Sequence, residues 1–411
     1  MIRKLLKKNT IWIGASETWL KVMSFIAILM IARIYGDTIF GQVSYVMAYL
    51  QLFQIIFDFG LHMIMTREIS QNIKKTEDIL AKYFGFKVLV GLIIVAALLA
   101  SIPFLQKDTA VITYLLAASG FMLFMSINQL LRGVFVAHEK FSLDAFSKIF
   151  ESTFFIILVS VTLYYKNVNL TMLSYSIAAT VGFVLLYYLL RKQSIKLRAR
   201  ISKKDIKEVF AQAWPLALAG LFVIVYFRID TIMLSYMKGD EVTGWYNAAY
   251  HFMYTFIFIP GFIMTSLFPK LSQFALNNKK KFKKLYVQSL LLITAVATVF
   301  MGTLWFAAEP IILQFYGAQY SPAVPVLKIL TIAVFLSYVS HVWLFALTAI
   351  KKQHMYTWAV GAGMIINVIL NIIFIPQYSL YAAAWTTVAT EIITGSVIFG
   401  SCQYFILKLR K

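Results

Sequence analysis

The stretch VIVYFRIDTIML, residues 223–234, places two charged side chains inside an otherwise apolar run. On insertion scales Arg and Asp each cost about 2.5–3.5 kcal/mol at the centre of a spanning helix, so Arg228 and Asp230 together cost roughly 5–7 kcal/mol. Eleven Leu, Ile, Val or Phe residues lie between positions 213 and 235, and they return roughly 3–7 kcal/mol. The segment is therefore nearly neutral as a spanning helix, and it must turn both charges toward protein or water.

The apolar character of this run extends over the whole chain. Of the 411 residues, 61% are hydrophobic and 13% are charged, whereas soluble domains average about half apolar and about a quarter charged. Apolar runs long enough to span a bilayer recur throughout the sequence. They predict an all-α polytopic membrane protein with no separate soluble domain. The twelve expected spans are 11–34, 40–65, 83–105, 110–131, 143–165, 170–190, 212–237, 244–268, 285–307, 324–349, 355–376 and 381–405.

The chain offers no soluble basic domain that could bind nucleic acid. The net charge of +21 is therefore interpreted as an excess of basic residues on one side of the membrane. With the N-terminus placed in the cytoplasm, the inner segments carry 31 Lys and Arg residues and the outer loops carry three. Basic residues accumulate in cytoplasmic loops. We therefore expect both termini to face the cytoplasm.

The basic connection 191–210 follows the sixth expected span and is the natural boundary between an N-terminal lobe, 1–200, and a C-terminal lobe, 201–411. Six spans in each half predict a parallel repeat. A weak sequence repeat supports it: YGDTIFG at 35–41 and KGDEVTG at 238–244 coincide after a shift of 203 residues. The glycines of this GDxxxG repeat suit a tight outer turn with positive φ, followed by the start of a helix.

Several catalytic and metal-binding classes are absent from the sequence. Cys402 is the single cysteine, so an internal disulfide and a cysteine metal cluster are excluded. No GK dipeptide occurs, which removes a Walker A loop, and His138-Glu139 does not continue into HExxH. We expect no enzyme activity, no cofactor and no metal site.

Charges inside the membrane are the candidate functional residues, because each is expensive in lipid. Arg228 is expected to face an aqueous cavity and bind an anion; the alternative is a structural salt bridge to another span. Residues i and i+2 point in different directions on a helix, so Asp230 needs a partner of its own. The candidates for substrate binding are Arg228, Lys21, Arg33, Lys328, Tyr226 and Tyr250, and those for ion coupling are Asp230, Asp58, Glu17 and Glu391.

For most of these residues a structural role is the alternative. Glu17 and Lys21 are four residues apart and could pair with each other. Asp58 could pair with Arg67. Arg33 and Lys328 lie near span ends, where a long side chain can snorkel to water. The tyrosines could pack in the core.

Four segments resemble polysaccharide flippases of the O-antigen or capsule (Wzx) type, in the MOP superfamily. They are FGQVSYVMAYLQLFQIIFDFGLHMIMTREIS (40–70), FRIDTIMLSYMKGDEVTGWYNAAYHF (227–252), LFPKLSQ (267–273) and LNIIFIPQYSLYAAAWTTVATE (370–391). Multidrug MATE exporters and lipid II flippases are more distantly similar. The resemblance implies two six-helix lobes around a central cavity that opens to each side in turn.

The resemblance also implies a substrate: an undecaprenyl-diphosphate-linked oligosaccharide that crosses to the outer leaflet of the bacterial inner membrane. Transport would be coupled to H⁺ or Na⁺, with membrane lipid, a polysaccharide polymerase and a chain-length regulator as partners. Physical chemistry also favours a hydrated, positively charged route for such a substrate. Each unpartnered hydroxyl of a glycan costs about 4–8 kcal/mol in hydrocarbon, and arginine binds phosphate oxygens bidentately. The rival hypotheses are a MATE-like cation-coupled exporter of small molecules and a membrane-embedded polysaccharide polymerase.

Overall fold

The computed structural model describes residues 2–257 and 259–408, and these residues form helices joined by short connections, without any strand. The expected all-α class is therefore confirmed. In chain order the helices are α1 (Ile2–Asp58), α2 (Leu61–Gln71), α3 (Thr76–Ser101), α4 (Thr109–Ala137), α5 (Phe141–Tyr164), α6 (Val168–Lys192), α7 (Lys203–Met237), α8 (Asp240–Phe256), α9 (Ile259–Asn277), α10 (Lys279–Phe315), α11 (Ala323–Ala349) and α12 (His354–Lys408).

Among the described residues, nine helical segments are long and apolar enough to cross a membrane. Two helices bend sharply at a single non-helical residue: α1 at Gly36, with φ 82°, and α12 at Ser379, with φ 55°. These bends lie between the first and second expected spans and between the eleventh and twelfth. The chain is thus a multi-pass membrane protein, and the number of twelve spans stays a prediction.

The expected spans 40–65 and 244–268 each contain parts of two helices, α1 with α2 and α8 with α9. Phe59 and Gly60 have φ of 54° and 66° and separate α1 from α2. Gly60 supplies both the left-handed turn and the space for a neighbour, because a Cβ there would lie 2.8 Å from Cβ of Leu216. In the eighth span, Pro260 lies in the first turn of α9. Proline is tolerated in a first turn, whereas it would break a helix that continued from α8 through this position.

The chain folds into two compact units, and it passes from one to the other inside α1 and inside α7. The first unit contains the residues up to Ile34 together with Val46–Ile224; the second contains Tyr35–Tyr45 and the residues from Val225 onward. The lobe boundaries of 1–200 and 201–411 stay a prediction. The 22 residues at the start of α7, from Lys203 to Ile224, belong to the first unit.

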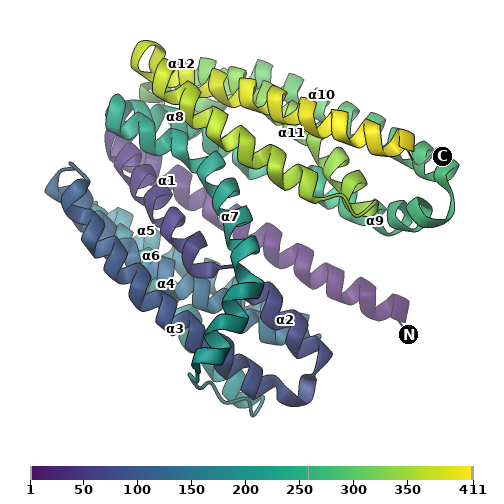
Figure 1. The fold of residues 1–411 in the computed structure, drawn as a ribbon. Helices are drawn as coiled ribbons and strands as arrows, with labels where there is room; N and C mark the ends of the chain where they lie inside the picture. Colours follow the sequence, from purple (N-terminus) through teal and green to yellow (C-terminus); the bar gives the residue numbers. More distant parts are fainter. Residues whose placement is uncertain (1, 258, 409–411) are drawn as a thin grey trace. The chain divides into compact units, whose positions relative to one another are not determined.

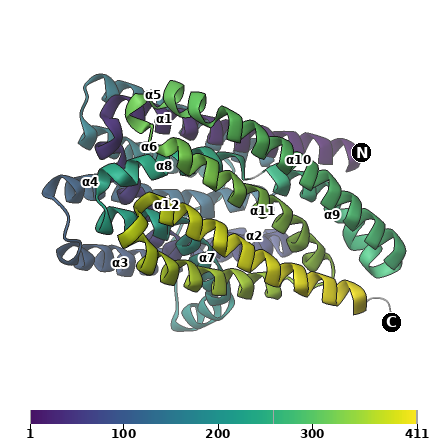
Figure 2. The ribbon, with the colours of Figure 1, turned by 90° about the horizontal axis from the view of Figure 1, so that it is seen from above.

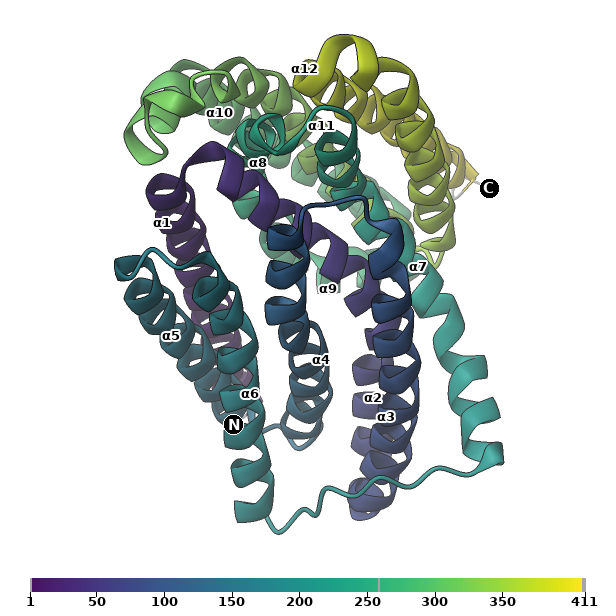
Figure 3. The same cartoon turned by 90° about the vertical axis from the view of Figure 1, so that its left-hand side faces the viewer.

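In the first unit, α4 packs along α6, α5 packs on α6, and α2 packs on α4, as Figure 3 shows. Val209 and Ala213 of α7 are fully buried in the core that these helices share. The connection before α7 is fastened to α3, since the backbone N–H of Arg200 donates to the carbonyl of Ala81 at 3.0 Å. The start of α7 is therefore held by packing on one face and by its loop.

In the second unit, α10 packs on α11 and α11 packs on α12, α8 and α9 (Figures 1 and 2). In the most apolar stretch of α11, more than half of the residues are buried, and this fraction is larger than in any other of the nine candidate spans of the described residues. That helix is thus the central element of the second unit.

The GDxxxG repeat lies within the second unit, and its first glycines have the expected conformation. Gly36 and Gly239 have φ of 82° and 91°, which a residue with a Cβ adopts only under strain. The prediction of positive φ at these two corresponding glycines is confirmed, and the outer location of the turns stays a prediction.

The later glycines of the repeat serve a different purpose, a close contact between α1 and α8. A Cβ on Gly41 would lie 1.7 Å from the carbonyl oxygen of Asp240, and a Cβ on Gly244 would lie 2.1 Å from that of Asp37. The contact is reciprocal, so each copy of the repeat receives the backbone of the other. Trp245 adds a hydrogen bond, because its indole N–H donates to Oδ2 of Asp37 at 2.9 Å.

Candidate functional site

The central residue of the candidate site is Asp230, a carboxylate on α7 that is 2% exposed within the second unit. Its Oδ1 accepts a hydrogen bond from Nδ2 of Asn371 at 2.6 Å. Its Oδ2 accepts from the hydroxyls of Tyr246 at 2.8 Å and Thr387 at 3.0 Å. All three donors are neutral, and among the described residues no lysine, arginine or histidine forms an ion pair with this carboxylate.

Two helices bring these donors to Asp230. Tyr246 comes from α8, whereas Asn371 and Thr387 come from the two halves of α12, before and after the bend at Ser379. The bend turns α12 back on itself, so both halves contact the same part of α7.

A second set of hydrogen bonds holds the amide of Asn371. Its Nδ2 also donates to Oδ1 of Asn367 at 3.0 Å, and its Oδ1 accepts from the hydroxyl of Thr386 at 2.6 Å. Asn367 in turn donates to the hydroxyl of Thr390 at 3.3 Å. The two asparagines therefore form hydrogen bonds to the other half of α12 and to α7.

A second carboxylate of the same unit, Glu391 of α12, is half-buried and accepts a hydrogen bond from the hydroxyl of Tyr226 at 3.0 Å. Tyr226 is buried. Tyr250, also buried, stacks on Tyr246 with the ring centroids 5.7 Å apart. Tyr226 therefore contacts the proposed carboxylate Glu391, and Tyr250 packs on Tyr246, a donor to Asp230.

Arg228 is 9% exposed on α7. It does not hydrogen bond to Asp230, as the spacing of two residues predicts. Lys328, another candidate, is half-buried on α11. That Arg228 and Lys328 bind substrate stays a prediction.

In the first unit, Asp58 has a lysine and a histidine as partners. Nζ of Lys87 lies 3.2 Å from its Oδ1, and Nδ1 of His62 lies 3.2 Å from its Oδ2. The expected pair with Arg67 is wrong, because Arg67 donates to Oε1 of Gln212 at 3.1 Å instead. Residues closer to Asp58 satisfy it instead: His62, which precedes Arg67 on α2, and Lys87 of α3.

The other candidates of the first unit lie on α1. Glu17 pairs with Lys148 of α5, with Nζ of Lys148 and Oε1 of Glu17 2.9 Å apart. Its carboxylate is therefore not available to Lys21 alone. Lys21 is half-buried and Arg33 is exposed. That Lys21 and Arg33 bind substrate, and that Glu17 couples an ion, stay predictions.

Sequence reasoning missed Lys87, which is fully buried in α3 beside the ring of Phe57. Lys87 lies within the expected span 83–105, and the apolar run VLVGLIIVAALLA that follows it, at 88–100, was the available signal of a charge inside the membrane. It also missed Tyr246 and Thr387 as donors to Asp230. For Thr387 the polar cluster TTVATE at 386–391 inside an expected span was the available signal.

Several solved membrane transporters have a similar fold. An inward-facing multidrug resistance MATE transporter of the MOP superfamily superposes with a TM-score of 0.79, at 12% identity and over 95% of each chain. The lipid II flippase MurJ in an inward closed conformation gives 0.76 at 18% identity, over 95% of this chain and 87% of that one. A MOP-superfamily transporter of Pyrococcus furiosus gives 0.69 at 13% identity, over 98% and 97%. The chain therefore has the fold of the MOP superfamily.

Sequence comparisons give the family. The sequence profile described as polysaccharide biosynthesis protein matches residues 6–275, and the MatE profile matches residues 215–373. An uncharacterised membrane protein of Methanocaldococcus jannaschii is 23% identical over 98% of both chains. A second one from that organism is 26% identical over 54% of this chain and 45% of its own length. The first profile covers well over half of the residues, so this chain belongs to the polysaccharide biosynthesis protein family.

Proposed function

We propose that the protein is a flippase that moves undecaprenyl-diphosphate-linked oligosaccharide units, O-antigen or a similar surface polysaccharide, from the cytoplasmic to the outer leaflet. It would act in the bacterial inner membrane with both termini in the cytoplasm, by alternating access and coupled to a cation gradient. A polysaccharide polymerase would use the delivered unit, together with a chain-length regulator. Family membership supports the polysaccharide pathway, and the fold supports transport.

The observation that carries the proposal is Asp230, a buried carboxylate with neutral partners only. Burying an ionised carboxylate without a compensating charge is strongly unfavourable. A buried charge inside a membrane protein is expected to serve an ion or substrate pathway. Asp230 therefore favours a site that takes up a cation, either H⁺ or Na⁺, and releases it again during transport.

The surroundings of Asp230 fit either ion. Hard cations take carboxylate, carbonyl and hydroxyl oxygens as ligands. Asp230 and Thr387 supply such oxygens, and Asn371 supplies another if its amide turns over, because an amide presents oxygen and nitrogen on opposite sides. A proton would instead let Asp230 itself donate a hydrogen bond. In both cases the bound cation neutralises the carboxylate, and this changes the balance between conformations.

Asp58 is the weaker coupling candidate. It already has Lys87 at 3.2 Å and His62 at 3.2 Å. An arrangement of this kind supports a structural ion pair, and we assign the coupling to Asp230.

Arg228 is the residue that would bind the anionic part of the substrate. A diphosphate crossing the bilayer needs fixed positive charge, and the planar guanidinium matches two phosphate oxygens at once. Arg228 is buried on the same helix as Asp230, two residues away. Substrate binding and ion binding would thus act on one segment of α7.

The test is a leaflet assay in proteoliposomes with a defined undecaprenyl-diphosphate-linked glycan. We expect wild-type protein to move the glycan across without changing its mass, whereas Arg228→Ala abolishes movement and Arg228→Lys keeps only part of it. Arg191→Ala is the matched control, because Arg191 is exposed at the end of α6. Loss of Arg228→Ala from the membrane would instead indicate a structural residue, and a glycan that grows longer would indicate a polymerase.

A second candidate function is cation-coupled export of small molecules. The MatE profile supports it, because its match, residues 215–373, includes both Asp230 and Asn371. Export would show as gradient-driven movement of drug-like cations, with no movement of the lipid-linked glycan.

A further inference from the structure

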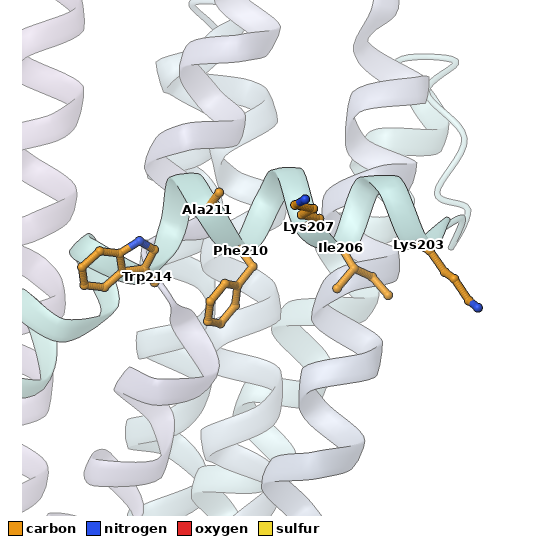
Figure 4. A pocket seen from close by; sticks show the side chains of 6 residues that line it. All are labelled: Lys203, Ile206, Lys207, Phe210, Ala211 and Trp214. Atoms are coloured by element: carbon orange, nitrogen blue, oxygen red, sulfur yellow. The ribbon is translucent and has the colours of Figure 1, made fainter.

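The first three turns of α7 have two contrasting faces. Val209 and Ala213 are fully buried in the first unit. On the other side Phe210 and Trp214 are about half exposed, at 51% and 49%. A hollow of about 550 Å³ lies on this side (Figure 4). Six residues line it, and we call them the α7 stripe: Lys203, Ile206, Lys207, Phe210, Ala211 and Trp214.

The charged end of the α7 stripe is uncompensated. Lys203 and Lys207 are exposed one turn apart, and among the described residues neither has an acidic partner. The neighbouring acids are committed elsewhere. Glu208 accepts from Nζ of Lys82 at 3.2 Å, and Asp205 accepts from Ser202 at the start of the helix. Two ammonium groups thus remain to attract an anion.

The order of residues along the α7 stripe matches the layers of a membrane. From Lys203 to Trp214 the helix rises by about 16 Å, at ~1.5 Å per residue. Lysines reach toward the headgroups, and tryptophan prefers the boundary with the acyl chains. The stripe begins a helix that is long and apolar enough to span the membrane. A ligand that fills the hollow must be charged at one end and apolar at the other.

We propose that the α7 stripe binds an anionic membrane phospholipid, with its phosphate at Lys203 and Lys207 and an acyl chain against Phe210 and Trp214. Charge complementarity and the change from ammonium groups to aromatic rings along one helix select this occupant. The site holds the segment of α7 that belongs to the first unit.

Bromine quenching of tryptophan fluorescence tests the proposal on the full chain. The protein has eight tryptophans, so the signal of Trp214 is the difference between wild type and Trp214→Phe. Both are reconstituted in bilayers with phosphatidylglycerol or phosphatidylcholine that carries brominated chains. We expect brominated phosphatidylglycerol to be preferred at Trp214 by about fivefold for each lysine.

Two variants sharpen the test. Lys203→Gln with Lys207→Gln removes the preference, whereas Lys279→Gln with Lys280→Gln leaves it unchanged. The latter pair is also exposed at the start of a candidate span, and residues 279–286 of that helix expose no large aromatic ring. Equal quenching by the two lipids, or a preference that survives loss of Lys203 and Lys207, overturns the proposal. Absence of any quenching at Trp214 also overturns it, because a protein segment would then cover the stripe.

Discussion

At the scale of single residues, the two buried aspartates have opposite surroundings. Asp58 is 7% exposed and has Lys87 as an ionic partner with His62 beside it, whereas Asp230 is 2% exposed and has only neutral donors. The sequence identified both, because a carboxylate in an apolar run is conspicuous. It could not distinguish them, because the partners come from other helices at sequence separations that a single chain does not reveal.

The ion pair of Asp58 leads to a prediction about stability. Lys87→Ala leaves Asp58 as a buried, largely uncompensated charge and is expected to destabilise the protein by roughly 3–5 kcal/mol. Replacing both partners, as Asp58→Asn with Lys87→Met, is expected to restore most of that loss. Thermal unfolding in detergent measures the difference.

Lys82→Ala is the matched control, because Lys82 is paired with Glu68 and Glu208 but is partly exposed. It is expected to cost about 1 kcal/mol or less. A double variant as unstable as Lys87→Ala would show that packing, rather than charge, holds this site.

At the scale of elements, local backbone rules were readable from the sequence and close packing was not. The repeat predicted positive φ at Gly36 and Gly239, because turn chemistry is local. The contact of Gly41 with Asp240 brings together residues about 200 positions apart, so no local pattern announces it. The helix breaks at Gly60 and near Pro260 were only partly predictable. Glycine and proline are local signals of a break, but the apolar residues on both sides are typical of a continuous span.

The reciprocal contact predicts that Gly41→Ala and Gly244→Ala are both harmful. A methyl group at either position meets backbone atoms, which cannot rotate away, and overpacking of this kind costs about 1–3 kcal/mol. Gly302→Ala on α10 is the control, because a Cβ there meets nothing within 4 Å. Melting temperatures of the purified variants compare the three; an unchanged melting temperature in Gly41→Ala contradicts the observed packing.

At the scale of the whole molecule, composition was sufficient to predict a polytopic helical protein, because apolar runs of spanning length have few other uses. The segments that resemble polysaccharide flippases predicted the MOP-superfamily fold, which the structural comparisons confirm. The sequence could not give the partners of the intramembrane charges. These depend on bends such as those at Gly36 and Ser379, which set the directions of whole helices.

The charge bias predicts the orientation of the molecule. Cysteines introduced at the N-terminus and in the basic connection 193–202 are expected to react with a membrane-impermeant maleimide only after the cells are opened. A cysteine at Lys107 or Lys166, on the other side of the predicted membrane, should react in intact spheroplasts. The background Cys402 is buried and is replaced by serine for this experiment. The reverse labelling pattern would invert the proposed direction of transport.

The most direct measurement of the central claim is gradient-driven movement of the lipid-linked glycan in proteoliposomes. The account predicts that a Na⁺ or H⁺ gradient accelerates movement by wild-type protein and by Asp205→Asn, which alters a carboxylate at the start of α7. Asp230→Asn, correctly folded and present at equal amount, should show no acceleration. Acceleration by the same gradient in Asp230→Asn would contradict the assignment of ion coupling to this buried carboxylate.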